Sequence, residues 1–178
     1  ARLEAAVARR AGMLDARHDA CRLVHAESDG LPGLVVDRYG TTAVIQVLSA
    51  GAEHWRAFWP DALRRVAGVT AVYERSDAEV RTLEGLAPRS GPVAGEPGAR
   101  AAMVEAGLRY DVDIATGQKT GFFLDQRDNR ALAGALARDA DVLNAFCYTG
   151  GFSLACLAGG ARQVLSVDTS AEALALGR

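Results

Sequence analysis

The stretch DVLNAFCYTGGFSLACLAGGARQVLSVDT, residues 141–169, constrains the fold more than any other part of the chain. Two short apolar runs, 141–146 and 163–168, enclose a glycine-containing turn and a segment of helical composition, 153–160. Neither run alternates apolar with polar residues, which is typical of parallel strands buried on both faces of a sheet. The residues after Asp168 begin another helix. The order strand, helix, strand, helix predicts an α/β domain.

The turn after the first run and the acid after the second lie where α/β units bind a nucleoside. Gly150 and Gly151 allow backbone N–H groups to approach a ligand closely, at the positive end of the following helix. Asp168 follows Gly150 by eighteen residues, at a strand end where a carboxylate can accept hydrogen bonds from ribose hydroxyls. The alternative is a tight turn with an aspartate that only caps. We further predict that Thr169 and Glu172 cap the next helix.

The glycine pattern discriminates between nucleoside cofactors. Dinucleotide sites use G-x-G-x-x-G, whereas residues 147–151 read C-Y-T-G-G and the next glycines come only at 159 and 160. A pyrophosphate needs the full pattern, so NAD is disfavoured. S-adenosylmethionine has no phosphate and therefore demands less of the turn.

The first hundred residues predict a smaller α+β domain. An amphipathic pattern over 2–16 predicts a helix, and β-rich runs near 22–26, 33–37 and 42–48 predict an antiparallel meander. The acids of the turns in this region, Glu27, Asp29 and Asp37, are assigned to structure because turns collect aspartates.

The next segment, 53–68, predicts a helix that restarts at Pro60 and ends on Gly68. Its aromatic residues Trp55, Phe58 and Trp59 fall at helical spacing and are assigned to the core, although a tryptophan can also stack on a base. Further elements are expected as a strand over 69–74, a capping box of Ser76 and Glu79 starting a helix that ends near Gly85, a hairpin turning at Ala106 and Gly107, and a helix over 126–138 with Leu132 and Leu136 inward.

The Pro/Gly-rich stretch 87–100 reads as a surface loop and as the domain boundary. We therefore predict a central α+β domain over 1–100 and the first part of a cofactor-binding α/β domain over 101–178. Two parallel strands with one complete crossover helix cannot close a doubly wound sheet, so the sequence is typical of a piece of a larger protein.

Composition limits the cellular context and the partners. The net charge of −2 gives no long-range attraction for nucleic acid, so RNA would need a local patch; apart from Lys119 the basic residues are arginines. Cys21, Cys147 and Cys156 show no metal-ligand spacing and, being three, no disulfide framework. No signal-peptide pattern and no apolar run of membrane-span length are present. We expect a cytoplasmic protein without a metal and without membrane association.

Three stretches carry a resemblance to a known family: ESDGLPGLVVDRYG (27–40), GQKTGFFLDQRDNR (117–130) and the stretch from Val142 to Leu174. Together, and in this order, they resemble bacterial class I methyltransferases of the 23S rRNA (cytosine-5) large-subunit type. The resemblance implies a PUA RNA-binding domain, a central α+β domain and a Rossmann-like catalytic domain, of which this chain holds the second and the start of the third. It also implies S-adenosylmethionine as cofactor, 23S ribosomal RNA as substrate and a homodimer.

The resemblance assigns roles to individual residues. The segment ahead of the first Rossmann strand helps to close the cofactor site, so Phe122 and Phe123 either cover the adenosine or pack as core. Gln126 or Arg127 can reach the methionine carboxylate, which a planar guanidinium matches. Asp125 is either the N-cap of the next helix or a ligand contact. The expected cofactor-binding residues are Phe122, Gln126, Arg127, Asn144, Phe146, Tyr148, Thr149, Gly150, Asp168 and Thr169.

The chain departs from the family in two respects. Many class I methyltransferases carry an acid at the position of Asn144, and the downstream Asp-Pro-Pro strand end and catalytic cysteine do not occur in these residues. Cytosine C5 accepts a methyl group only after a thiolate has added to C6. Cys147 is a weak candidate because it lies in the cofactor turn, so the nucleophile is expected beyond residue 178. The alternatives are a non-catalytic RNA-binding module and a dinucleotide-dependent oxidoreductase fragment.

Overall fold

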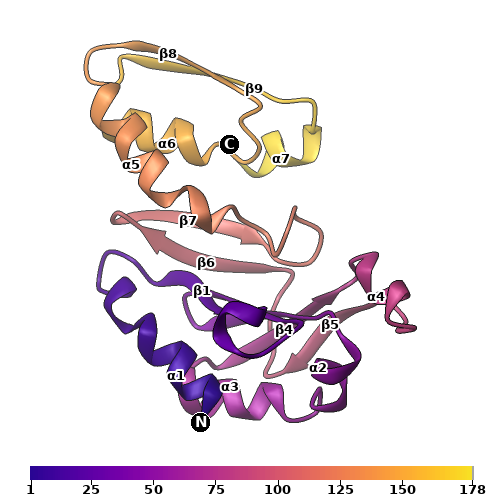
Figure 1. The fold of residues 1–178 in the computed structure, drawn as a ribbon. Coiled ribbons are helices and arrows are strands. Elements are labelled where there is room, and N and C mark those ends of the chain that lie inside the picture. The colour runs from indigo at the N-terminus through magenta and orange to yellow at the C-terminus, as the bar shows by residue number, and fades with distance from the viewer. Residues whose placement is uncertain (178) are drawn as a thin grey trace. The chain divides into compact units, whose positions relative to one another are not determined.

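A computed structural model describes residues 1–177, and the chain divides into two compact units, one from Ala1 to Phe122 and one from Phe123 onward. Figure 1 traces the elements of both along the chain. The domain boundary predicted near residue 100 remains a prediction. In the structure the hairpin that follows residue 100 belongs to the first compact unit, which ends at Phe122.

The first unit is built on a five-stranded sheet in the order β1-β2-β3-β4-β5. The first three strands form the predicted antiparallel meander, whereas β3 and β4 pair in parallel. A parallel pair needs a long crossover, and helices α2 and α3 provide it, so the sheet is mixed rather than antiparallel throughout. The strands are β1 (Ala20–His25), β2 (Leu34–Tyr39), β3 (Thr42–Val47), β4 (Ala71–Ser76) and β5 (Arg89–Ala94), and the crossover helices are α2 (Ala50–His54) and α3 (Trp59–Ala67).

Strand β5 lies inside the stretch predicted as a loop, and that prediction was wrong for residues 89–94. The strand pairs antiparallel with β4 and is the last strand of the sheet. An edge position tolerates Pro92, because a missing N–H matters only on the side that faces a neighbour. The Pro and Gly residues of this stretch therefore belong in part to an edge strand, and not only to a loop.

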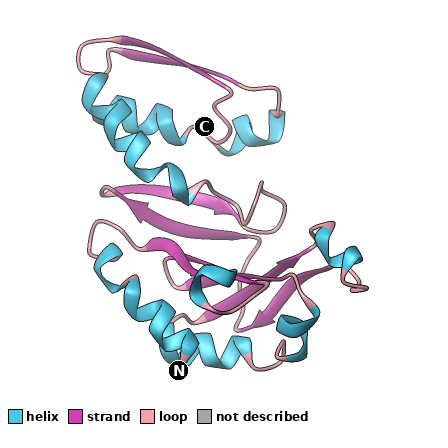
Figure 2. Cartoon of the chain, in the orientation of Figure 1, coloured by secondary structure: helices cyan, strands magenta, loops and turns pink. Residues whose placement is uncertain are grey.

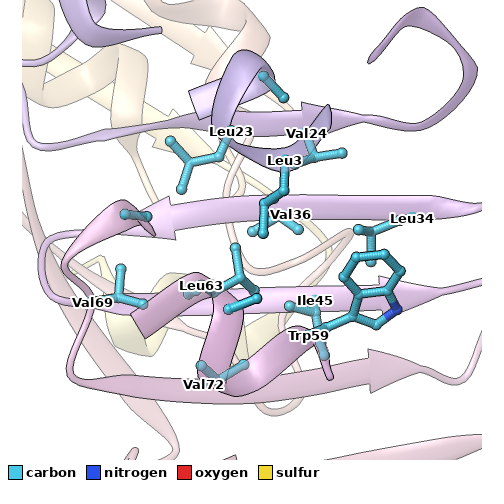
Figure 3. Packing of buried hydrophobic residues seen from close by; sticks show 14 of the residues in the cluster. Leu3, Leu23, Val24, Leu34, Val36, Ile45, Trp59, Leu63, Val69 and Val72 are labelled. Atoms are coloured by element: carbon cyan, nitrogen blue, oxygen red, sulfur yellow. The ribbon is translucent and has the colours of Figure 1, made fainter. Parts of the chain in front are cut away.

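Helices α1 (Arg2–Arg9) and α3 lie against one face of this sheet, where the main apolar core is found. Figure 3 shows Leu63 and Trp59 of α3 among side chains such as Ile45 and Val72 of neighbouring strands. The predicted helix over 2–16 is shorter than expected: it ends at Arg9 and is followed by a 3-10 turn, η1 (Ala11–Met13). Gly12 within that turn lowers helix propensity.

Two of the three aromatic residues assigned to the core are exposed, so that prediction was wrong for Trp55 and Phe58. Their exposed fractions are 56% and 47%, whereas that of Trp59 is 7%. Helix α2 ends at His54 and α3 begins at Trp59, so no continuous helix holds the three rings on one face. Pro60 is accommodated in the first turn of α3, because a backbone N–H at that position would have no partner within the helix.

The opposite face of the sheet receives the hairpin of β6 (Arg100–Glu105) and β7 (Leu108–Asp113). Its turn residues Ala106 and Gly107 have φ of +54° and +81°, as a type I′ turn requires, which confirms the predicted hairpin. The loop that follows is anchored by Thr120. Its hydroxyl lies 2.6 Å from an Asp37 carboxylate oxygen and 2.8 Å from the Tyr39 hydroxyl.

The predicted capping box of Ser76 and Glu79 is not formed. Ser76 ends strand β4, and its hydroxyl accepts the N–H of Val47 at 2.8 Å. The short helix α4 spans Val80–Leu83 without a side-chain cap. Since Ser76 satisfies a buried backbone donor of the sheet, it is unavailable to the helix.

Asp29 has the structural role that was predicted for it. It lies in the 3-10 turn η2 (Ala26–Asp29), and its carboxylate, 1% exposed, accepts hydrogen bonds from Arg9, Arg10 and the N–H of His25. Burial raises the pKa of this carboxyl, but the hydrogen bonds from Arg10, Arg9 and His25 outweigh burial and leave the pKa well below 3.8.

We expect Asp29→Asn to lower the free energy of unfolding by about 2 kcal/mol at pH 7, because hydrogen bonds to a charged group are lost. A carboxylate with a depressed folded-state pKa stabilises the fold above its unfolded pKa of about 4, and that contribution is lost as the pH falls toward the folded-state value. Urea denaturation should therefore show a smaller difference at pH 3 than at pH 7. Asp61→Asn, which changes an 85% exposed side chain, is the control. An equal difference at both pH values would contradict the assignment.

The second unit contains a two-stranded parallel sheet, β8 paired with β9, joined by a crossover helix. Figure 2 shows the two strands and the helices of this unit. Their order confirms the predicted α/β pattern and, with the first unit, the predicted fold class. The elements are η3 (Leu124–Gln126), α5 (Arg127–Leu136), β8 (Asp141–Ala145), α6 (Gly151–Ala158), β9 (Gln163–Val167) and α7 (Ala171–Leu176).

Leu132 and Leu136 do not point inward among the described residues: their exposed fractions are 59% and 75%. Helix α5 instead packs on α6 through its buried residues Arg130 and Gly134. A Cβ on Gly134 would lie 2.8 Å from the carbonyl oxygen of Ala155 in α6, so only glycine permits this approach. The close contact, rather than the leucine spacing, therefore sets the rotation of α5.

Candidate functional site

The turn between β8 and α6 has an irregular backbone. Phe146, Tyr148 and Gly150 have φ of +60°, +51° and +81°, and the N–H of Gly150 donates to the carbonyl oxygen of Cys147 at 2.9 Å. Left-handed backbone is uncommon for bulky residues and is typical of functional turns. The Phe146 side chain is 88% exposed. The turn thus presents an aromatic residue and the first N–H groups of α6 at the carboxyl end of the strand.

Asp168, directly after β9, holds this turn in place. One carboxylate oxygen accepts the N–H of Tyr148 at 2.7 Å and the other accepts the N–H of Ser170 at 2.9 Å. These hydrogen bonds, that of Ser170 before that of Tyr148, lower the pKa of the carboxyl below its usual value. Each carboxylate oxygen has a second lone pair. Asp168 can therefore support the turn and still accept hydrogen bonds from ligand hydroxyls.

The cap of α7 is Ser170, and the prediction of Thr169 with Glu172 was wrong. The Ser170 hydroxyl accepts the N–H of Ala173 at 3.2 Å, and Thr169 is exposed between Asp168 and the cap. The N-cap lies one residue later than the spacing of Thr169 and Glu172 suggested. Asp168 accepts the N–H of Ser170, and this hydrogen bond fixes the bend before the helix.

A hydrogen-bonded group of polar side chains lies beneath the turn and was not predicted. The Asn144 amide donates to the Ser153 hydroxyl at 2.8 Å, and that hydroxyl lies 2.7 Å from the hydroxyl of Ser166. The group joins β8, α6 and β9. The sequence offered one signal for this group: each of the two apolar runs contains a polar residue, Asn144 and Ser166, and these two pair in register.

Phe123 contacts the turn. The rings of Phe123 and Tyr148 meet edge to face with centroids 5.6 Å apart. The Phe123 carbonyl accepts a hydrogen bond from Arg130 at 3.0 Å, and the Arg130 guanidinium lies over the ring of Phe152. Phe122 is buried in the first unit beside Tyr110, with ring centroids 5.3 Å apart.

The predicted carboxylate-binding residues lie at the start of α5. Gln126 is held by its neighbours, since it donates to Asp125 at 3.3 Å and accepts from Asn129 at 2.9 Å. Arg127 is the first residue of the helix. Asp125 lies in the turn η3 and is not the N-cap, because the helix begins after Gln126 and has no side-chain cap. The assignment of Gln126 and Arg127 to a ligand remains a prediction.

The cysteines are poorly suited to nucleophilic chemistry. Cys21, Cys147 and Cys156 are all buried. Burial, and then the charge of Asp168, raises the pKa of the Cys147 thiol, and burial raises that of Cys156. Since the thiolate is the reactive form, neither Cys147 nor Cys156 is activated.

Within residues 1–177, which the structure describes, no group of three or more His, Cys, Asp or Glu side chains is arranged to hold a metal ion. No helix in that range combines the length and apolar character that crossing a membrane requires.

Comparison with protein families matches residues 87–178 to the S-adenosylmethionine-dependent methyltransferases. A curated relative, the ribosomal RNA large subunit methyltransferase I of Tolumonas auensis, is 51% identical over 161 residues, 89% of this chain and 41% of its own length. The protein of that name from Alteromonas mediterranea is 48% identical over 178 residues, 99% of this chain and 45% of its own length. The chain thus spans less than half the length of these relatives.

Solved structures agree with this match. A SAM-dependent methyltransferase from Streptococcus mutans superposes with a TM-score of 0.83 and 28% identity, covering 99% of this chain and 46% of that one. A methyltransferase in complex with SAH gives the same TM-score and identity over 99% of this chain and 45% of that one.

Proposed function

We propose that this chain, which belongs to the S-adenosylmethionine-dependent methyltransferase family, supplies the first part of the cofactor site of an enzyme that methylates large-subunit ribosomal RNA. The observation that carries the proposal is the contact of Asp168 with Tyr148, which joins the strand-end acid to the exposed turn. The two features occur in a sequence about half identical to ribosomal RNA methyltransferases.

The residues at the turn fit the cofactor in chemistry. Asp168 is suited to accept hydrogen bonds from the two ribose hydroxyls, since an ionised carboxylate only accepts. Phe146 and Tyr148 offer aromatic surface to the adenine, with Thr149 and Gly150 completing the turn. S-adenosylmethionine, when bound, supplies a methyl group on a positively charged sulfur.

The remaining assignments follow from the same proposal. Gln126 or Arg127 binds the methionine carboxylate, and Phe122 and Phe123 help to close the site, Phe123 through its ring contact with Tyr148. Asn144 acts as a positioning residue through Ser153. Thr169, exposed next to Asp168, lies within the same strand-end segment.

The proposed target is C5 of a cytosine in 23S rRNA, which rests on the resemblance of the three sequence stretches. That reaction requires a thiolate to add to C6 before the methyl transfer and a base to remove the C5 proton afterwards. The raised pKa of the Cys147 thiol and its hydrogen bond to the Tyr148 carbonyl at 3.6 Å disfavour it as the nucleophile. We infer that this chain binds the cofactor and does not itself provide the thiolate.

Calorimetric titration with S-adenosylhomocysteine tests the proposal, with NADH titrated in parallel. Saturable binding of S-adenosylhomocysteine without binding of NADH is expected. Binding of NADH alone would favour the oxidoreductase alternative. Binding of neither, with RNA still bound, would favour the non-catalytic RNA-binding module.

A homodimer and a cytoplasmic location complete the proposal; the homodimer rests on the family resemblance and the cytoplasmic location on the cysteine usage of the sequence. Sedimentation velocity over a range of protein concentrations tests the dimer. A mass that stays monomeric throughout would remove it.

A further inference from the structure

An aromatic cluster lies on the surface of the first unit, at the junction of α2 and α3. The rings of His54, Trp55, Phe58 and Trp59 follow one another edge to face, with successive centroids 5.2, 6.2 and 5.5 Å apart. Trp59 is anchored, since its indole N–H donates to the Ala52 carbonyl at 3.0 Å. The cluster thus has a buried, fixed end and an exposed end formed by Trp55 and Phe58.

A cavity of about 510 Å³ opens beside these rings. Its wall combines the start of α1, the Gly30–Pro32 turn and the α2–α3 junction, and includes Trp55, Phe58 and Trp59. The volume falls within the range of roughly 300–1,000 Å³ typical of small-molecule sites. A concave apolar surface of this size can enclose an unstacked base.

The charged residues of the cavity wall favour an anionic ligand. Arg2 and Arg65 line it, and Arg2 is held at the rim by a hydrogen bond to the Gly30 carbonyl at 2.8 Å. The lining also holds one acidic residue, Glu4, against these two arginines. Arginine beside exposed aromatic rings is the arrangement that binds single-stranded nucleic acid, with stacking on the rings and charge for the phosphates.

We propose that this cavity binds an unpaired nucleotide of RNA, with the base against Trp55 and Phe58 and a flanking phosphate on Arg65. The inference rests on the proposed RNA substrate and adds a second contact, separate from the cofactor turn. It also gives a negatively charged protein a local patch for RNA, since the net charge of −2 provides no general attraction.

Fluorescence anisotropy of a labelled single-stranded oligoribonucleotide of about eight nucleotides tests the site. Trp55→Ala is expected to weaken binding about tenfold, in the range measured for loss of one base–aromatic stack. Arg65→Ala is expected to weaken it about threefold and to reduce the salt dependence by about one phosphate contact. In Trp59→Phe, where Trp55 is the remaining tryptophan, the RNA should quench the fluorescence.

Matched controls separate this site from general effects. Leu83→Ala removes an 87% exposed apolar side chain of the same unit that does not line the cavity. Arg64→Ala removes the neighbouring charge on α3, which lies 3.9 Å from Asp61. Both controls should bind the oligonucleotide as the unaltered chain does.

Several outcomes would overturn the proposal. These are unchanged binding by both Trp55→Ala and Arg65→Ala, equal affinity for a duplex of the same length, or self-association that Trp55→Ala abolishes without any change in RNA binding. Titration with S-adenosylhomocysteine distinguishes this site from the proposed function. If Trp55-dependent RNA binding occurs without cofactor binding, the nucleotide site stands and the methyltransferase proposal fails.

Discussion

Asp168→Ala is expected to weaken the binding of S-adenosylhomocysteine by at least about tenfold, the cost of leaving polar partners without an acceptor. The substitution removes the proposed acceptor for the ribose hydroxyls. It also releases the N–H groups of Tyr148 and Ser170, so the turn is no longer held to the end of β9. Isothermal titration calorimetry measures the effect directly.

Two variants make this result specific. Asp168→Asn keeps the shape and one acceptor oxygen, so an intermediate loss of affinity is expected. Asp141→Ala removes another exposed carboxylate of the same unit, paired with Arg162 at 2.8 Å, and should leave the affinity unchanged. If Asp168→Ala binds S-adenosylhomocysteine as well as the unaltered chain does, the carboxylate only supports the turn.

Arg81→Met is expected to lower the free energy of unfolding by about 3–5 kcal/mol, the cost of breaking a buried ionic group by removing one partner. The Arg81 side chain is 1% exposed and donates to the carbonyls of Val47 and Ala87 and to Glu53 at 3.0 Å. Methionine fills similar space but leaves these acceptors without a donor. The melting temperature should fall by about 10 °C for a chain of this size.

The control for Arg81 shares its carboxylate partner. Arg89→Met removes a half-exposed arginine that lies 3.7 Å from Glu53, and exposed ion pairs contribute little. Thermal unfolding followed by circular dichroism should therefore separate the two variants clearly. Equal losses would mean that the shared carboxylate, and not the buried backbone carbonyls, accounts for the effect.

Features that depend on neighbouring residues were predictable from the sequence. The order of strands and helices from residue 141 onward, the hairpin at Ala106 and Gly107 and the meander of the first three strands all follow from hydrophobic periodicity and turn chemistry. Both signals act over a few residues. The glycine turn and Asp168 were found in the same way, because the strand ends of an α/β unit bring them to one edge.

The candidate site was predictable only in part. Asp168 binds the N–H of Tyr148 within the turn, and Phe123 meets the Tyr148 ring, whereas the binding of a ligand by these residues stays a prediction. Two adjacent phenylalanines look equivalent in sequence. The contact of one ring with Tyr148 and of the other with Tyr110 depends on elements distant along the chain.

The sequence by itself determined the type and order of most elements and the residues of the turn after β8, since local backbone preferences dictate both. Only the tertiary structure decided that β3 and β4 pair in parallel, that a Pro/Gly-rich stretch becomes the edge strand β5, that Arg81 is buried and that Trp55 and Phe58 are exposed. Each of these depends on which distant surfaces are available for packing and hydrogen bonding. The free energy of this packing and hydrogen bonding depends on segments far apart in the chain, so a local sequence pattern cannot predict it.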